Sequence, residues 1–209
     1  MWDSIRADKL QWLPDVGLGF LAPSVPFEYG ADYFAHYEAI ANTEAAEGLN
    51  RVRLQMLERH ISGNDVVVDV GIGAGTFIEA CDAADVRVYG YDVNPRGVDW
   101  LVSRGRYRDP YLSRCHVACF WDSLEHIANP TALLRNVSHA VLVSLPIFRD
   151  ASHARLSKHY KPGEHIWYFT DAGIIWFMER HDFALDEHNV SECAWRDEIH
   201  SYAFHRKAG

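Results

Sequence analysis

The sequence predicts an α/β fold with a doubly wound, mostly parallel sheet, and three observations support this. Short β-branched runs alternate with segments of helical periodicity between residues 64 and 181, which is typical of a parallel sheet with helices on both faces. Residues 183–206 read as two consecutive strands, which predicts an antiparallel edge at the C-terminal end. The chain before residue 62 has no such strand pattern, so we expect an N-terminal helical extension there.

The N-terminal extension is expected to cover residues 1–61, with a ligand-binding domain at 62–209. Residues 1–30 are rich in Pro, Gly and aromatic residues, which predicts an irregular course over the surface. Helical spacing follows in residues 31–46 and 48–61. The aromatic side chains of this extension are expected either to form a lid over the ligand or to pack an N-terminal helix; they are Tyr29, Tyr33, Phe34 and Tyr37.

The elements of the main domain follow from hydrophobic patterns and helix-start signals. Asn129 is a suitable N-cap, and Pro95 and Pro130 suit the first positions of two helices. Residues 149–169, dense in His, Lys and aromatic residues, are expected to form one long loop. The predicted strands are 64–70, 86–92, 115–121, 140–146, 183–190 and 198–206. The predicted helices are 75–83, one from Pro95, one from Pro130, and 171–181.

Composition narrows the class of protein. The formal net charge is −9, which argues against broad nucleic-acid binding because phosphate contacts need a cationic surface. We expect no signal peptide and no membrane span. There is no CxxC pair among the four cysteines. Cys115, Val117 and Cys119 are expected to share one buried strand face as structural positions rather than metal ligands, so a cytoplasmic location is predicted.

A glycine-rich turn follows the first strand of the main domain in "VVVDVGIGAGTF", residues 66–77. Gly71, Gly73 and Gly75 allow a tight turn and the close approach of a ligand. A dinucleotide fingerprint needs glycine where Thr76 stands, and a phosphate-binding P-loop needs a GK[ST] ending. The turn is therefore poorly suited to pyrophosphate.

Two acidic residues point to a different ligand. Asp69 precedes the glycines, where a carboxylate would repel phosphate and pair with an ammonium group. Asp92 ends the second strand, where a carboxylate accepts hydrogen bonds from both hydroxyls of a ribose. A ligand with an amino-acid end and a ribose end fits both anchors, and S-adenosylmethionine is such a ligand. Arg51 or Arg53 is expected near its carboxylate.

Three motifs together resemble the class I S-adenosylmethionine-dependent methyltransferases: "VVVDVGIGAGTF", "VYGYDVNP" and "CFWDSLEHIANPTALL". The segment with Asp122, Glu125, His126 and Pro130 is similar to the D/E-x-x-E-H pattern of the ubiquinone-biosynthesis-type O-methyltransferases. The later "HYKPGEHIWYFTDAGIIWFMERHDF" also resembles that group. The resemblance covers roughly residues 30–190 and implies a Rossmann-like fold in the domain at 62–209.

The resemblance also implies roles for individual residues. Asp69, Gly71 and Gly73 would line the methionine end of the cofactor, and Asp92 would bind its ribose. The adenine would lie near Val93, and the sulfonium end beside Trp121 and Asp122. The segment between Asp92 and Cys115 is shorter than the family usually has. The third strand there is therefore expected to be short or absent, with Asp109 as a replacement for the usual adenine-contacting acid.

The methyl-transfer step requires a base, because the nucleophile must lose its proton. If a helical turn begins after Asp122, then Asp122, Glu125 and His126 share one face. These three are candidates for catalysis or for holding a divalent metal, which would lower the pKa of a substrate hydroxyl. The alternative is that Glu125 caps a helix and His126 packs against the sheet. His165, in the loop, is a second candidate base, and His200 and His205 are treated as structural.

The leading hypothesis is therefore a methyltransferase acting on oxygen or nitrogen of a small molecule. A non-catalytic binding or regulatory protein on the same fold is the alternative, motivated by the short 93–114 segment. A nicotinamide-dependent oxidoreductase is a third hypothesis, against which Thr76 argues. The sequence indicates neither the substrate nor the oligomeric state.

Overall fold

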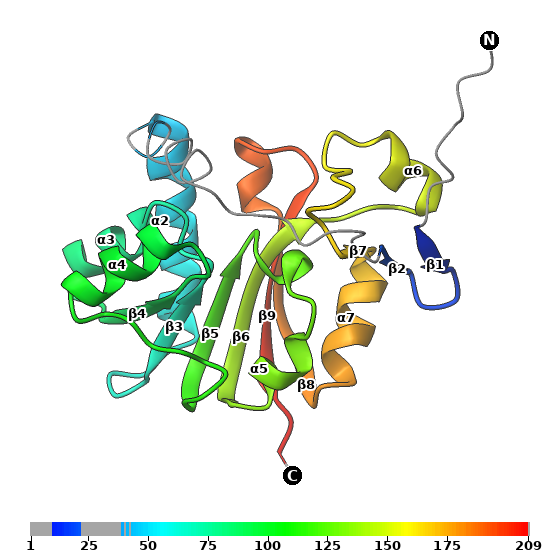
Figure 1. Cartoon of the computed structure of the whole chain (residues 1–209). Helices are drawn as coiled ribbons and strands as arrows, with labels where there is room; N and C mark the ends of the chain where they lie inside the picture. Colours follow the sequence, from blue (N-terminus) through cyan, green and yellow to red (C-terminus); the bar gives the residue numbers. More distant parts are fainter. Residues whose placement is uncertain (1–9, 22–38, 40, 42, 209) are drawn as a thin grey trace.

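A six-stranded mixed sheet forms the centre of the computed structural model, which describes residues 10–21, 39, 41 and 43–208 (Figure 1). The strand order is β4-β3-β5-β6-β9-β8. Four strands are parallel: β3 (Val67–Val70), β4 (Val88–Tyr91), β5 (Cys115–Trp121) and β6 (Val137–Pro146). The antiparallel edge consists of β8 (Phe183–Asn189) and β9 (Ile199–Arg206). The predicted fold class is confirmed.

Helices cover both faces of this sheet and create two separate cores (Figure 1). On one face lie α2 (Glu44–Arg59), α3 (Thr76–Ala83) and α4 (Pro95–Ser103). On the other lie α5 (Pro130–Leu134) and α7 (Asp171–Glu179). The predicted N-cap Asn129 accepts a hydrogen bond from the Ala132 backbone N–H. Asn94, which was not predicted as a cap, accepts one from the Arg96 backbone N–H.

The sequence of strands places a ligand site. From β3 the chain moves to β4 on one side and then to β5 on the other, so the strand order reverses at β3. In sheets of this kind the crevice at the carboxyl ends of such strands binds ligands. The glycine turn after β3, Asp92 after β4 and Asp122 after β5 all lie at this edge.

A second sheet of three short strands was not predicted. β1 (Gln11–Leu13) and β2 (Leu18–Phe20) form a hairpin, and β7 (Trp167–Phe169) pairs with β2. The expectation of an irregular segment is wrong for these residues, as is that of one long loop at 149–169, which contains α6 (Ala151–Leu156) and β7. Strands of three residues are too short to produce a periodic pattern. The sheet anchors the end of the segment at 157–166 that reaches the ligand site.

The strand β5 corrects one prediction about cysteines. A register shift between Cys115 and Val117 turns Cys115 toward the α7 side of the sheet, while Val117 and Cys119 face the α2 side. Cys115 therefore does not share a face with the other two. All four cysteines are free thiols, three of them buried, and the pKa of the buried Cys119 thiol is raised by desolvation.

The third strand expected between Asp92 and Cys115 is reduced to a single bridge, between Gly90 and Tyr107.

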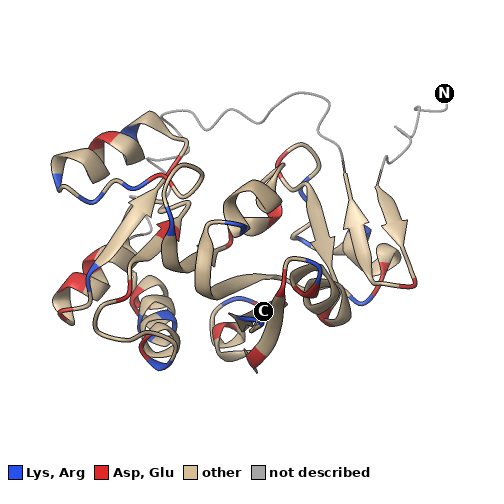
Figure 2. Ribbon diagram, turned by 90° about the horizontal axis from the view of Figure 1, so that it is seen from below, with Lys and Arg blue, Asp and Glu red and all other residues tan. Residues whose placement is uncertain are grey.

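Basic and acidic positions are interspersed over the described helices (Figure 2). Within the described ranges, the helices are too short or too polar to cross a bilayer.

The boundary at residue 61 remains a prediction, although α2, which precedes it, contributes Met56 and Leu57 to the core. The aromatic residues expected to form a lid lie outside the described residues, as does most of the helix expected at 31–46.

Candidate active site

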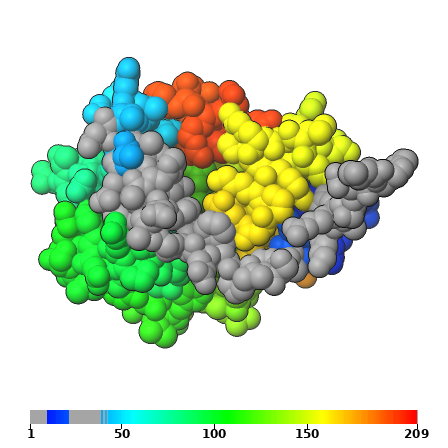
Figure 3. All heavy atoms as spheres, turned by 45° about the horizontal axis from the view of Figure 1, so that its top comes forward, coloured from blue at the N-terminus to red at the C-terminus, as the bar shows by residue number. Residues whose placement is uncertain are grey.

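A cavity of about 700 Å³ lies at the carboxyl ends of β3, β4 and β5. This volume is within the range of small-molecule sites. Residues from α2 and from the segment 157–166 also border it, as does Arg196, which follows η2 (Ser191–Ala194). Figure 3 shows the blue surface of α2, the orange surface of η2 and the yellow surface of the 150–166 region next to one another on this face.

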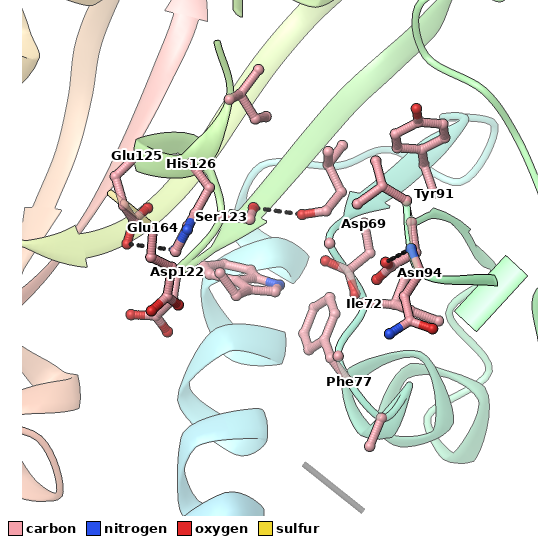
Figure 4. A pocket seen from close by; sticks show the side chains of 18 of the residues that line it. Asp69, Ile72, Phe77, Tyr91, Asn94, Asp122, Ser123, Glu125, His126 and Glu164 are labelled. Carbon is pink, nitrogen blue, oxygen red and sulfur yellow. Dashed lines mark hydrogen bonds and ion pairs between the residues drawn. The ribbon is translucent and has the colours of Figure 1, made fainter. Parts of the chain in front are cut away.

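Two groups of polar side chains lie at opposite ends of the cavity (Figure 4). The first, which we call the glycine end, contains Asp69, the glycine turn and Asp92. The second, the histidine end, contains Glu125, His126 and His165, with Asp122 beside them. Of the site residues predicted from the sequence, those that do not line this cavity are Gly75, Asp109 and Arg51.

The glycine end begins with a turn in which Gly71, Gly73 and Gly75 all have positive φ (81°, 55° and 79°). A Cβ atom on Gly71 would lie 2.8 Å from Cβ of Ser123, and one on Gly75 would lie 2.8 Å from the Trp100 ring. The Ser123 hydroxyl also donates to the Val70 carbonyl at 2.5 Å. Gly71 is therefore required where the turn meets the end of β5, whereas Gly75 serves the packing of α3 against α4.

Asp69 is almost completely buried, with 1% of its surface exposed. Its Oδ1 atom has no hydrogen-bond partner among the described residues. Desolvation raises the pKa of this carboxyl to about 8, while the positive charge of Arg53 acts in the opposite direction. A buried acceptor without a donor costs roughly 1–3 kcal/mol, so this atom is suited to a cationic donor group of a ligand.

Asp92 links the end of β4 to the glycine turn. Its Oδ1 accepts a hydrogen bond from the Asn94 backbone N–H at 2.7 Å. Burial raises the pKa of this carboxyl, and backbone N–H groups of Asn94, Val93, Ile72 and Gly73 act to lower it. Val93, 63% exposed, lies at the cavity rim.

The region expected to contact adenine has an aromatic residue instead of an acid. Asp109 does not line the cavity; its Oδ1 accepts a hydrogen bond from the Tyr111 backbone N–H at 2.8 Å. Tyr111 does line it, with its ring centroid 5.7 Å from that of Tyr91. The sequence does not point to Tyr111, because aromatic residues in a segment without strand or helix periodicity have no distinguishing pattern.

Asp122 adopts a left-handed conformation, with φ of 56°. Asp is one of the residues that tolerate this region. Its carboxylate accepts hydrogen bonds from two guanidinium groups: Arg53 at 3.0 Å, and both terminal nitrogens of Arg196, one of them at 2.6 Å. These contacts outweigh desolvation and lower the pKa of Asp122 to about 2.

A buried acid completes this ion-pair network. Glu192 in η2, with 1% of its side chain exposed, accepts two hydrogen bonds from Arg53, at 2.7 and 2.8 Å. Arg53 also lies over the Trp121 ring, 5.3 Å from its centroid. Of the two arginines that the sequence suggested, Arg53 lines the cavity and Arg51 is exposed. Glu192 and Arg196 were missed because they lie far along the chain from their partners.

At the histidine end, two buried titratable groups, Glu125 and His165, face the partly buried His126. Ligand atoms of Glu125, His126 and His165 all lie within 4.8 Å of each other, and the two imidazole centroids are 4.6 Å apart. Glu125 Oε2 and His165 Nδ1 have no hydrogen-bond partner among the described residues. The first belongs to a short 3₁₀ turn, η1 (Leu124–His126), and His165 precedes β7.

Burial governs the protonation of these groups. Desolvation and then the charge of Asp122 raise the pKa of Glu125 to about 8. Desolvation lowers the pKa of His126. Desolvation, together with the charges of His126 and Lys161, lowers the pKa of His165 to about 2. At neutral pH both imidazoles are therefore neutral and Glu125 is largely protonated, and as the pH rises to about 8 the ionised form of Glu125 becomes able to accept a proton.

The shared helical face expected for Asp122, Glu125 and His126 is wrong. Asp122 lies outside the helical turn because of its left-handed backbone, and the three-and-four spacing rule does not apply to it. The carboxylate of Asp122 is held by arginines, and His165 takes its place beside Glu125 and His126. Glu125 lines the cavity.

Comparison with known protein families gives one match for this chain. A family model described as "Methyltransferase domain" matches residues 37–188 of the 209. Comparison with the sequences of curated proteins found no match.

Solved structures similar to the chain include three methyltransferases. Magnesium protoporphyrin IX methyltransferase from Synechocystis PCC 6803, with bound S-adenosylhomocysteine (SAH), has a TM-score of 0.60 and 15% identity over 86% of this chain and 96% of that one. The Burkholderia thailandensis 1,6-didemethyltoxoflavin-N1-methyltransferase, with bound 1,6-didemethyltoxoflavin and SAH, has a TM-score of 0.60 and 12% identity over 96% of this chain and 100% of that one. The CcbJ methyltransferase from Streptomyces caelestis has a TM-score of 0.61 and 10% identity over 87% of this chain and 100% of that one. At these identities the likeness concerns the fold alone.

Proposed function

The chain belongs to the methyltransferase-domain family, and we propose that it transfers a methyl group from S-adenosylmethionine to an oxygen or nitrogen atom of a small molecule. The observation that carries this proposal is one cavity whose glycine end offers a buried acceptor and whose histidine end offers a carboxyl with a pKa of about 8. Two of the similar structures contain bound SAH, which supports the choice of cofactor.

The glycine end would bind the cofactor through two carboxylates. Asp69 Oδ1 would accept from the ammonium group, which would also supply the positive charge that the buried carboxyl lacks. The oxygen of Asp92 not used by Asn94 would accept from the ribose hydroxyls. Val93 and Tyr111 would flank the adenine, and Trp121 would lie near the sulfonium end. When bound, the cofactor supplies a methyl group already activated by the sulfonium charge.

The histidine end would take the substrate proton. Glu125 has the pKa best matched to this role, since a base works best when its pKa is near the operating pH. His126 and His165, both neutral, would orient the nucleophile or relay the proton. Asp122 would act as a positioning residue, holding Arg53 and Arg196 at the cavity wall.

A divalent metal, if one takes part, would be held by Glu125, His126 and His165, whose donor atoms are close enough to share an ion. Both oxygens of Asp122 are occupied by arginines, so it is the less suitable ligand. We also propose membership of the ubiquinone-biosynthesis-type group, from the D-x-x-E-H segment at 122–126. The free thiols support a cytoplasmic location.

Calorimetry with SAH, together with transfer of labelled methyl groups from S-adenosylmethionine to a metabolite extract, tests the function. We expect Asp92→Ala to weaken SAH binding by about 10–100-fold, since a hydrogen bond to a charged group contributes roughly 1.5–3 kcal/mol. Asp99→Asn, an exposed acid of α4 outside the cavity, is the matched control and should bind normally. Absence of SAH binding by the native chain at millimolar concentration would contradict the proposal; binding without transfer would favour the regulatory alternative.

A further inference from the structure

A cluster of two histidines and an aspartate lies outside the cavity, where α2 meets the antiparallel edge of the sheet. His60 is the C-cap of α2, Asp186 belongs to β8 and His205 to β9. His60 Nδ1 is 3.0 Å from His205 Nε2, and Asp186 Oδ2 is 3.5 Å from each of these nitrogens. The three atoms thus form a compact triangle from three elements.

The size of this triangle matches metal coordination. A tetrahedral zinc ion with metal–nitrogen distances of about 2.0–2.1 Å separates its ligand atoms by roughly 3.3 Å. The observed separations, 3.0 and 3.5 Å, lie on either side of this value. The Asp186 side chain is 55% exposed, so solvent reaches the fourth coordination position.

The surroundings orient His60 as a ligand. Its Nε2 atom is 2.9 Å from Glu187 Oε2, and the side chain is 5% exposed. Arg59 and Asn189 also donate hydrogen bonds to the Glu187 carboxylate. With the Nε2 proton shared with this carboxylate, the Nδ1 lone pair faces His205 and Asp186. Such carboxylate–histidine pairs are typical of metal sites.

A second triangle of the same residue types differs in one respect. Asp171, His188 and His200 have ligand atoms 2.9, 3.2 and 3.6 Å apart. The hydroxyl of Tyr202, however, donates to Asp171 Oδ1 and lies 3.4 Å from His200 Nδ1. The Tyr202 hydroxyl is an additional donor to the aspartate of this cluster, so the cluster serves as a comparison for the first.

We propose that His60, Asp186 and His205 bind a divalent transition-metal cation, in the first place Zn²⁺, at a structural site separate from the cavity. The bound ion would join the C-terminal end of α2 to β8 and β9. Two elements near this site also carry residues of the ion-pair network beside the cavity. Arg53 belongs to α2, and Glu192 belongs to η2, which lies between β8 and β9. The cation would therefore stabilise the framework on which that ion pair depends.

Calorimetric titration of the full chain with ZnCl₂ after removal of metal by a chelator tests the proposal. We expect one equivalent to bind tightly and the melting temperature to rise with zinc concentration. His205→Ala and Asp186→Asn should each weaken binding by on the order of 100-fold, and Glu187→Gln by about 10–100-fold. The visible spectrum of the Co²⁺-loaded chain should indicate four-coordination.

Two controls separate this site from other histidine clusters. His188→Ala, in the triangle with Tyr202, and His165→Ala, in the cavity, should retain the tight zinc equivalent. Loss of binding in His165→Ala, binding that survives both His205→Ala and Asp186→Asn, or no zinc binding at millimolar concentration would each overturn the proposal. The exposed Asp186 variant gives a result even if replacing His205 impairs folding, which circular dichroism of the metal-free variants would detect.

Discussion

The two ends of the cavity are built in opposite ways. The glycine end comes from residues 69–94, in two consecutive strand–turn units whose contacts are mostly with backbone groups. The histidine end combines side chains of η1 and the 157–166 segment with Asp122, whose charge pairs with Arg53 of α2 and with Arg196. The comparison shows that one end depends on local conformation and the other on long-range electrostatics. Variants at the two ends should therefore fail in different ways.

The largest effect is expected at Arg53, which holds both Asp122 and Glu192. Arg53→Met should lower the free energy of unfolding by about 3–5 kcal/mol, because it leaves two acids without their cation. Urea denaturation measures this loss. Lys158→Met, which removes an exposed pair with Asp197, is the matched control and should cost less than about 1 kcal/mol. Equal losses in the two variants would show that the network at the histidine end is not a buried one.

The next effect concerns chemistry at the histidine end. Glu125→Gln should lower kcat by about 100-fold with little change in the KM for S-adenosylmethionine, since it removes the proposed base. In the native chain kcat should rise with pH and level off above about pH 8, the pKa of Glu125. This rise should be absent from the variant. Asp69→Asn, the counterpart at the glycine end, should instead raise KM, so the two buried acids separate binding from catalysis.

The same pKa gives a prediction about stability. Unfolded, Glu125 loses its proton near its ordinary pKa of 4.5, whereas in the folded chain it keeps the proton to about pH 8. The unfolded state therefore binds fewer protons in this interval, and the contribution of Glu125 to stability falls as pH rises from about 4.5 to 8. Relative to the native chain, Glu125→Gln should gain stability over this interval. A stability difference that does not change with pH would contradict the assigned pKa.

The contrast between the two ends also explains what the sequence predicts. The turn at Gly71 and the acids Asp69 and Asp92 lie within a short stretch whose pattern specifies both structure and position. The sequence predicts that Asp122 shares a helical face with Glu125. Its left-handed conformation, which nothing in the neighbouring sequence indicates, places it outside the helical turn. Its arginine partners include Arg196, 74 residues later, and such pairing is a property of the folded chain alone.

A smaller effect is expected at Gly71. Gly71→Ala should destabilise the chain by about 1–3 kcal/mol, because alanine is strained at a φ of 81° and its Cβ would lie 2.8 Å from that of Ser123. SAH binding should weaken as well, since the turn must shift. Gly63→Ala, at a position with open space around it, is the control and should leave thermal melting and SAH affinity unchanged. An unchanged affinity in Gly71→Ala would mean that the turn does not contact the ligand.

The smallest effect distinguishes two hypotheses about the adenine. If Tyr111 flanks the ring, Tyr111→Ala should weaken SAH binding by about 2–10-fold, the contribution of roughly 0.5–1.5 kcal/mol typical of an aromatic pair. Asp109→Asn keeps the oxygen that accepts from the Tyr111 backbone and removes only the charge, so it should bind SAH normally. Calorimetry of the two variants would decide between them. If the asparagine variant lost affinity and the alanine variant did not, Asp109 would be the adenine contact. The glycine end, which the local sequence pattern specifies best, would then include a residue well after Asp92.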